Sequence, residues 1–344
     1  MAPLPEGSVL IRSGLAASDL LATNMSRLVG DSWFEPADLV VSRVQRTRTG
    51  VAIVVLSTDS GPPAAIVKLA LTDAATDRLD VETEILQALH ADDRLDHWRK
   101  LIPQPIGAGT IRGKRYRVDA PLRGESVTNS LGSRPFRRAV LHEAADAIRV
   151  LHGATAQTLT GGPSLGRNWV TAHVRELSRV MGGDPGLRLA LERLSDELNG
   201  VLADGAFAAS WVHGDYWPGN LLFSGVASRR PTLSGIVDWD ASGPAECPLH
   251  DVLHLALYTT RITSGRELGE IVSERLCGPE WSADERNVFT SYAAPAWEQL
   301  SDRHALLLYW LRQMSMHIRQ QATIGGWRLM LWQRRNVRPV LESL

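Results

Sequence analysis

The sequence predicts an α+β protein in two lobes, a small antiparallel β-sheet lobe with one helix followed by a larger, mostly helical lobe. β-branched runs separated by turn residues fill residues 40–71, and helical patterns dominate from about residue 136 onward. A stretch rich in Pro, Gly and Ser lies between them. We therefore expect an N-terminal lobe at 1–120, a hinge at 121–135 and a C-terminal lobe at 136–344.

The N-terminal lobe is expected to begin with a short helix at residues 19–30. Three strands should follow at 40–46, 51–58 and 64–71, where Val, Ile and Leu recur. The segments RTRTG and DSGPP, which separate these strands, have the composition of turns. Three strands in series predict an antiparallel meander.

A helix and a hairpin complete the first lobe. Residues 76–92 carry leucine and isoleucine at roughly helical spacing with acidic residues between them, so this helix should pack on the sheet. Residues 102–124 read as a hairpin with turn residues at Gly107, Gly109 and Gly113. The lobe is therefore expected to contain five strands and one helix.

The second lobe reads as helical from about Phe136 to Val212. After Val212 the pattern becomes loop, strand, turn and strand, as far as the end of the segment LSGIVDWD. Residues 250–344 are helical again and rich in tryptophan. The loop and hairpin thus lie between two helical regions.

Composition excludes several classes of function. The chain has 344 residues with 37 Lys and Arg against 38 Asp and Glu, so no global charge favours nucleic acid or an anionic membrane. Cys247 and Cys277 are too few for a disulfide framework and lack metal-ligand spacing. The start of the sequence lacks the apolar core of a signal peptide, and no apolar run has the length of a membrane span. We expect a cytoplasmic protein with a small-molecule partner.

Residues with catalytic chemistry are concentrated in the loop and hairpin after Val212. The string WVHGDYWPGN places Asp215 and Asn220 on one loop, and Asp238 follows at the end of an apolar strand one hairpin later. Phosphoryl transfer needs groups that position a hydroxyl and hold Mg²⁺, and hard Mg²⁺ prefers oxygen ligands. We expect Asp215 to accept or orient the hydroxyl proton and Asn220 and Asp238 to bind metal.

Each of these residues also has a plain structural reading. Asp215 and Asn220 are residue types that cap turns through local hydrogen bonds, and Asp238 could close a turn after its strand. His213 is expected to brace the loop by hydrogen bonding rather than to transfer protons. The complete combination favours catalysis over a set of separate turns.

With these motifs the chain resembles the aminoglycoside phosphotransferase and choline kinase family, which has a protein-kinase-like fold. The resemblance covers residues 211–220 and 235–240 and, less sharply, residues 40–125. It implies a small-molecule kinase that uses Mg²⁺ and takes ATP or GTP as the phosphate donor. The acceptor would be a small hydroxylated compound.

The resemblance also implies roles for individual residues. Asp215 would be the catalytic residue, Asn220 and Asp238 would be metal ligands, and Asp251 in PLHDVLHL would steady the catalytic loop. Either Asp238 or Asp240 could ligate the metal, and we prefer Asp238, with Asp240 supporting it.

A nucleotide anchor is expected in the first lobe. The family places a phosphate-binding lysine on the third strand and an orienting glutamate on the next helix, which here implies Lys68 and Glu82. A lysine among apolar strand residues is costly to bury unless an anion pairs with it. Glu84 lies only two positions from Glu82 and is the alternative partner.

The first hairpin turn is a further candidate for phosphate binding. It has only Gly50 and no glycine-rich phosphate motif. The side chains of Thr47, Arg48 and Thr49, or the backbone amides of residues 46–50, could reach the phosphates, but a plain hairpin turn fits the sequence equally well.

The acceptor is the least constrained part of the prediction. Residues 241–344 contain 11 acidic residues and 11 arginines, so no excess negative charge would recruit a polycation. Trp217 in the catalytic loop would face the acceptor cleft or pack beneath it. We expect an antibiotic-modifying enzyme that confers resistance, with an aminoglycoside-, sugar- or nucleoside-type acceptor. The alternatives are a metabolic sugar or alcohol kinase and an inactive binding module of the same fold.

Overall fold

A computed structural model describes residues 39–47, 49–58, 61–181, 184–278, 280–292, 300–320 and 326–344. The chain divides into two compact units. The first comprises Met1–Asp93 and Arg99–Arg123, and the second comprises Arg94–Trp98 and Gly124–Leu344. The helix expected at residues 19–30 lies outside the described residues.

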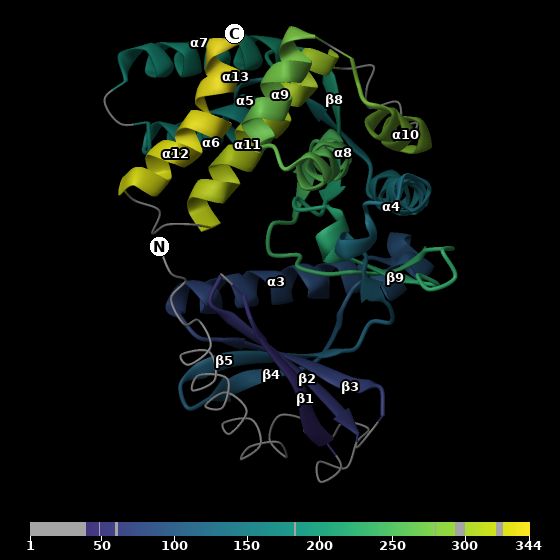
Figure 1. Cartoon of the computed structure of the whole chain (residues 1–344). Helices are drawn as coiled ribbons and strands as arrows, with labels where there is room; N and C mark the ends of the chain where they lie inside the picture. The colour runs from purple at the N-terminus through teal and green to yellow at the C-terminus, as the bar shows by residue number, and fades with distance from the viewer. Residues whose placement is uncertain are drawn as a thin grey trace, which may run out of the picture. The chain divides into compact units, whose positions relative to one another are not determined.

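The first unit contains the predicted five-stranded sheet, in the order β1-β2-β3-β5-β4, with every neighbouring pair antiparallel (Figure 1). Its strands are β1 (Leu39–Arg46), β2 (Val51–Thr58), β3 (Pro63–Ala70), β4 (Gln104–Ile111) and β5 (Lys114–Ala120). Alternate residues of β2, among them Ala52, Val54 and Leu56, are fully buried because one face of the pleated strand packs into the core. The predicted meander and hairpin are confirmed.

The predicted helix of this unit is α3 (Asp73–Ala91), which packs on β3, β4 and β5. Its first turn is capped by Thr72, whose side chain accepts a hydrogen bond from the backbone N–H of Ala75. The buried face includes Leu79, Leu86 and Leu89, at the spacing of a helix that covers a sheet. A 3-10 segment (Asp93–Leu101) follows α3.

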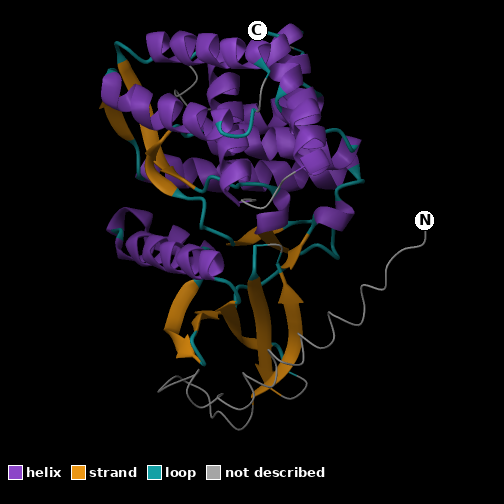
Figure 2. Cartoon of the chain, turned by 90° about the vertical axis from the view of Figure 1, so that its left-hand side faces the viewer, coloured by secondary structure: helices purple, strands orange, loops and turns teal. Residues whose placement is uncertain are grey.

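Helices form most of the second unit (Figure 2). They are α4 (Arg134–Ala154), α5 (Pro163–Gly166), α6 (Ala172–Ser178), α7 (Pro185–Val201), α8 (Leu249–Ser264), α9 (Leu268–Cys277), α10 (Ala283–Tyr292), α11 (Asp302–Gln320), α12 (Gly326–Asn336) and α13 (Arg338–Glu342). Short 3-10 turns occur at Thr128–Ser130 and Pro218–Asn220, and a π-helical turn at Arg167–Thr171.

Two small antiparallel sheets complete this unit, in the orders β10-β9-β6 and β11-β8-β7. Their strands are β6 (Glu125–Ser126), β7 (Gln157–Thr160), β8 (Ala206–Val212), β9 (Leu221–Ser224), β10 (Thr232–Ile236) and β11 (Gly243–Glu246). The expectation of helix up to Val212 is therefore wrong for β7 and β8. The alanines of β8 favour a helix locally, but pairing with β7 and β11 on both sides overrides that preference.

Helices α8 and α11 lie in the interior of the second unit. Both are buried around most of their circumference, including polar residues such as His254 on α8 and Arg312 on α11. Buried polar side chains need partners, and those of His254 and Arg312 include the loop after β8. Among the described residues, every helix is too short or too polar to cross a membrane.

Candidate active site

The loop between β8 and β9 brings Asp215 and Asn220 together. The Asn220 side chain donates from Nδ2 to the Asp215 carboxylate oxygen Oδ2 at 2.8 Å and to the Asp215 backbone carbonyl at 2.9 Å. Asn220 is buried, whereas the Asp215 side chain keeps 34% of its surface exposed. The carboxylate is therefore held by the protein and still reachable from outside.

His213 lies behind the loop and joins it to the end of β10. Its ring is fully buried; Nδ1 accepts the backbone N–H of Asp215 at 3.2 Å, and Nε2 donates to the carbonyl of Val237 at 3.0 Å. Burial lowers the pKa of His213 against the pull of the nearby carboxylates, so the ring is neutral at pH 7. These contacts are those of a bracing residue.

Asp251 on α8 holds the same loop from the opposite direction. Its two carboxylate oxygens accept the backbone N–H groups of His213 and Gly214, each at 2.7 Å. Burial would raise the pKa of Asp251, but hydrogen bonds from His152 and from the loop amide of His213 hold it below its ordinary value. Gly214 has a φ of +85°, and a Cβ there would lie 2.2 Å from the Ala241 carbonyl oxygen. The loop backbone therefore requires glycine at this position.

Asp238 and Asp240 follow β10, beside the Asn220 end of the loop. The N–H of Val237 donates to the Asn220 carbonyl at 2.9 Å, so the chain reaches Asp238 immediately after this contact. Asp238 has a φ of +63°, in the left-handed region that Asp tolerates better than most residues. Both aspartates are half-buried. Asp238 stays the predicted metal ligand, with Asp240 as the alternative.

The loop has a further partner that the sequence did not reveal. His254 on α8 lies with Nε2 3.0 Å from the Asp215 oxygen Oδ1 and with Nδ1 2.9 Å from the hydroxyl of Tyr309 on α11. Burial disfavours the charged form of Asp215, but the His254 hydrogen bond, the nearby histidines and Asn220 hold the pKa of Asp215 below its ordinary value. The only sign of His254 in the sequence was its position three residues after Asp251.

Helix α11 supplies two more contacts to this loop. Arg312 donates from Nη1 to the Gly214 carbonyl at 3.1 Å and from Nη2 to the Ala241 carbonyl at 3.0 Å, and Gln313 donates to the same Gly214 carbonyl at 3.0 Å. Arg312 also pairs with Glu246 at 3.3 Å. The planar guanidinium thus ties the loop between β8 and β9 to the segment that follows Asp240.

Trp217 lies at the exposed edge of the loop beside α8. Its ring is half-buried, and its centroid lies 4.9 Å from that of Tyr258. The guanidinium of Arg261 lies 4.8 Å from the Tyr258 centroid, and Tyr258 also contacts the ring of His254. The two readings of Trp217, facing an acceptor or packing beneath it, are both compatible with this position.

In the first unit, Lys68 on β3 pairs with Glu82 on α3. The Lys68 ammonium lies 2.8 Å and 3.0 Å from the two Glu82 oxygens, and both side chains are at least 90% buried. Glu84, the alternative partner, is exposed. Arg117, fully buried on β5, contacts Glu82 at 3.1 Å and forms a bidentate pair with Asp119. The sequence did not reveal this second cation.

The first hairpin turn is closed by its own threonines. The Thr47 hydroxyl lies 2.8 Å from that of Thr49 and 3.1 Å from both the backbone N–H and the carbonyl of Val51. Arg48 lies outside the described residues. The contacts of Thr47 are those of a hairpin turn, and they leave the expected phosphate contact of Thr49 as a prediction.

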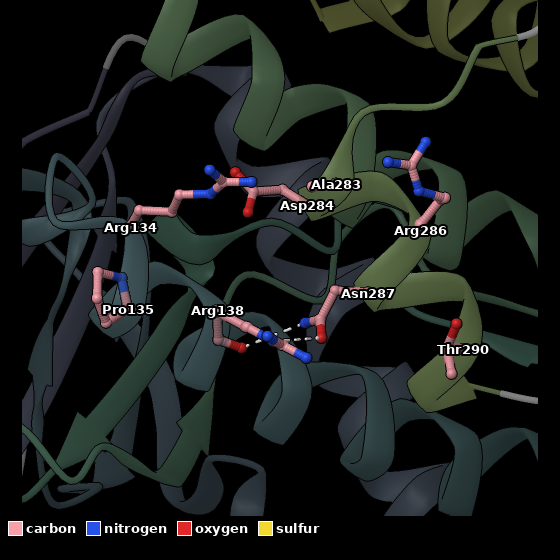
Figure 3. A pocket seen from close by; sticks show the side chains of 8 residues that line it. All are labelled: Arg134, Pro135, Arg138, Ala283, Asp284, Arg286, Asn287 and Thr290. Carbon is pink, nitrogen blue, oxygen red and sulfur yellow. Dashed lines mark hydrogen bonds between the residues drawn. The ribbon is translucent and has the colours of Figure 1, made fainter.

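A surface pocket of about 700 Å³ lies elsewhere in the second unit, between the start of α4 and α10 (Figure 3). Its lining includes Arg134, Arg138, Asp284, Arg286 and Asn287. Arg138 donates to the Asn287 side chain at 3.1 Å, and Asn287 donates back to the Arg138 carbonyl at 3.3 Å. The residues predicted to act in catalysis are all absent from its lining.

The described residues contain no group of three or more His, Cys, Asp or Glu side chains arranged to hold a metal ion. Asn220, Asp238 and Asp240 carry side-chain oxygens of the kind that bind Mg²⁺. Because Mg²⁺ keeps several waters and takes only one or two protein carboxylates in phosphate-binding sites, this donor set fits it.

Comparison with known proteins gives one family match. The sequence model of the phosphotransferase enzyme family matches residues 51–286, which is more than half of the chain. None of the curated proteins compared with the chain matches it by sequence.

Several solved structures are similar in fold. The ADP-bound aminoglycoside phosphotransferase APH(2'')-Ib is 13% identical, covers 88% of this chain and 93% of its own, and superposes with a TM-score of 0.51. The gentamicin complex of APH(2'')-IIa is 12% identical over 100% of this chain and 95% of its own, with a TM-score of 0.49. APH(3'')-Id from Streptomyces rimosus, in complex with ADP and streptomycin, is 17% identical over 86% and 98%, with a TM-score of 0.48. The first likeness confirms the predicted two-lobed fold.

Proposed function

The chain belongs to the phosphotransferase enzyme family, and on that basis we propose that it transfers the terminal phosphate of ATP or GTP to a hydroxyl of a small molecule. Family membership confirms the predicted class of enzyme. The observation that carries the proposal further is the state of Asp215, whose carboxylate is fixed by two side chains and yet one third exposed.

In the proposed reaction, Asp215 accepts the proton of the acceptor hydroxyl. The hydroxyl oxygen forms a bond to the terminal phosphorus while the bond from that phosphorus to the bridging oxygen breaks, which releases the nucleoside diphosphate. Asn220 donates to one oxygen of the Asp215 carboxylate, so the carboxylate is oriented before the acceptor arrives. Catalysis in such sites consists mainly of positioning and charge stabilisation.

Asn220 and Asp238 are the residues that we propose to hold Mg²⁺. The Asn220 amide nitrogen is occupied by Asp215, which orients the amide and leaves its oxygen as the metal-binding atom. Asp238 would supply a charged oxygen, with Asp240 in support. When bound, Mg²⁺ neutralises charge on the phosphate oxygens of the nucleotide.

Lys68 is proposed to bind the nucleotide phosphates, with Glu82 orienting it. Glu82 also contacts Arg117, so its negative charge is shared between two cations and Lys68 retains attraction for a phosphate. Arg48 and Thr49 are proposed as further phosphate contacts from the first hairpin turn.

Trp217 and Tyr258 are proposed to contact the acceptor. Aromatic faces suit sugar rings and nucleobases, and Arg261 places a positive charge against Tyr258. We therefore place the acceptor among sugar- and nucleoside-bearing hydroxyl compounds, and we propose antibiotics of this kind, with resistance as the consequence.

The proposal is tested by a phosphorylation screen with ATP and GTP against hydroxylated antibiotics and sugars, run over a range of Mg²⁺ concentrations. We expect Asp215→Asn to lower kcat on the best acceptor by about 10²–10⁴-fold while nucleotide still binds. Asp238→Asn should instead raise the Mg²⁺ concentration needed for half-maximal activity, because it removes a charged ligand.

Near-normal kcat in Asp215→Asn would refute the catalytic assignment. A wild-type protein that binds nucleotide but neither transfers phosphate to any acceptor nor hydrolyses ATP with Mg²⁺ would be an inactive binding module. An unchanged Mg²⁺ requirement in Asp238→Asn would move the metal to Asp240.

A further inference from the structure

Among the described residues of the second unit, two hydrogen-bonded series of side chains share the same three residue types, tyrosine, histidine and aspartate. In one, the Tyr292 hydroxyl lies 2.8 Å from Nδ1 of His152, whose Nε2 lies 3.1 Å from Asp251. In the other, the Tyr309 hydroxyl lies 2.9 Å from Nδ1 of His254, whose Nε2 lies 3.0 Å from Asp215. The two histidines are buried to the same degree, at 4% and 2% exposure.

The two series end in different surroundings. Asp251 is fully buried, and both of its oxygens accept hydrogen bonds from backbone N–H groups of the loop. The series through His152 therefore supports the structure of the loop. The Asp215 side chain is 34% exposed, so the series through His254 ends on a carboxylate that an acceptor can reach.

The chemistry of the partners fixes the direction of the hydrogen bonds. An ionised carboxylate can only accept, so Nε2 of His254 carries the hydrogen that is donated to Asp215. When the ring is neutral, Nδ1 accepts from the Tyr309 hydroxyl. Burial raises the pKa of Tyr309 well above its ordinary value, which keeps that hydroxyl protonated and able to donate.

The His254 ring is also clamped by its neighbours. The rings of Tyr258 and Tyr309 lie with centroids 4.7 Å and 5.9 Å from that of His254. Since Asn220 donates to the other oxygen of Asp215, both carboxylate oxygens have a fixed donor and the plane of the carboxylate is determined.

We propose that His254, oriented by Tyr309, is a positioning residue that holds the plane of the Asp215 carboxylate toward the acceptor hydroxyl. This inference rests on the proposed function, because it assigns Asp215 the task of accepting that proton. A small rotation of the carboxylate would misalign the reacting atoms, and such misplacements are costly in rate.

Kinetics of His254 variants test the role. We expect His254→Leu to lower kcat by about 10–100-fold with the KM for nucleotide changed less than about threefold. His254→Gln should recover part of the loss, because its amide can donate to Asp215, and Tyr309→Phe should lower kcat by a smaller factor than His254→Leu.

His250→Gln is the matched control, since His250 lies one turn earlier on α8 and is equally buried, and its ring nitrogens make no hydrogen bond, with Nδ1 3.7 Å from the Glu246 carboxylate. It should keep kcat within about threefold of wild type. If His254→Leu lowers only the melting temperature, or if His250→Gln loses as much kcat as His254→Gln, the positioning role is wrong.

The contact itself is tested without turnover by ¹⁵N NMR of the histidine rings. We expect the Nε2–H tautomer for His254, and a shift of its resonances in both Asp215→Asn and Tyr309→Phe. The Nδ1–H tautomer, or resonances unmoved by Asp215→Asn, would overturn the inference. A wild-type protein that transfers no phosphate while the NMR result holds would instead refute the proposed function and leave His254 as a purely structural ligand of Asp215.

Discussion

At the scale of single residues, Glu82 is the shared anion of a buried four-residue network. It pairs with Lys68 on one side and with Arg117 on the other, and Arg117 pairs in turn with Asp119. Removing one member of a buried ion pair is normally destabilising because the other charge is left without compensation. Here Arg117 still compensates Glu82 when Lys68 is removed, so the role of Lys68 can be tested without unfolding the protein.

We therefore expect Lys68→Met to fold and to lower kcat/KM for nucleotide, measured by initial rates together with calorimetric nucleotide binding. Lys68→Arg should also be impaired, because a planar guanidinium does not reproduce a compact ammonium. Glu82→Gln combined with Lys68→Met should cost less than the sum of the single changes, since both act through one contact. Strictly additive losses, or wild-type kinetics in Lys68→Met, would remove Lys68 from the nucleotide site.

The sequence was sufficient to predict contacts among residues that belong to a short motif. Asp215 and Asn220 lie on one loop and contact each other as expected, and Glu82 rather than Glu84 meets Lys68. Arg117 and His254 could not be found in the same way. Arg117 reaches Glu82 through the register of two strands, and His254 reaches Asp215 from a helix that begins 34 residues later. Such contacts depend on tertiary packing, which no local spacing encodes.

At the scale of elements, the strands of the first unit were predictable because β-branched runs and turn residues agree with their pairing. Strands β7 and β8 were not, since Gln157–Thr160 is short and Ala206–Val212 is alanine-rich, and their pairing partners lie far along the chain. The sequence predicted that the second unit would be mostly helical. Only the structure showed that α8 and α11 are its buried helices.

Helix α11 stabilises the catalytic loop through Arg312, and this leads to a prediction. Arg312→Lys should lower the free energy of unfolding by about 2–4 kcal/mol, because one ammonium cannot serve the Gly214 and Ala241 carbonyls and Glu246 together. Urea unfolding measures the loss. Arg328→Lys, on the exposed surface of α12, is the control and should change stability by less than about 0.5 kcal/mol. Equal stability of Arg312→Lys and wild type would show that the loop does not depend on Arg312.

At the scale of the whole molecule, buried histidines determine how stability responds to acid. Burial lowers the pKa of His173 to about 3, against an ordinary value of 6.5, and lowers those of His213 and His250. A histidine with a lowered folded pKa contributes stability that is present above pH 6.5 and is lost as the pH falls toward the folded pKa. Unfolding binds protons in this range.

We expect the free energy of unfolding to fall between pH 7 and pH 5, before most carboxylates titrate. Each such histidine contributes a slope of at most about 1.4 kcal/mol per pH unit. His173→Gln should therefore flatten the slope, as measured by urea unfolding at several pH values with tryptophan fluorescence. A slope identical to wild type would mean that His173 is not held neutral in the folded state.

The two hydrogen bonds that backbone N–H groups donate to Asp251 have a consequence for motion. If the loop from His213 to Asp215 lifted away by itself, the Asp251 carboxylate would be left ionised in the interior, without the N–H groups that now solvate it. We therefore expect local opening of this loop to cost about as much free energy as global unfolding. Its backbone amide hydrogens should then exchange with solvent as slowly as those of the surrounding helices. Asp215, the proposed catalytic residue, therefore lies on a segment that we expect to be rigid, and movements that admit and release the proposed acceptor should take place in other segments.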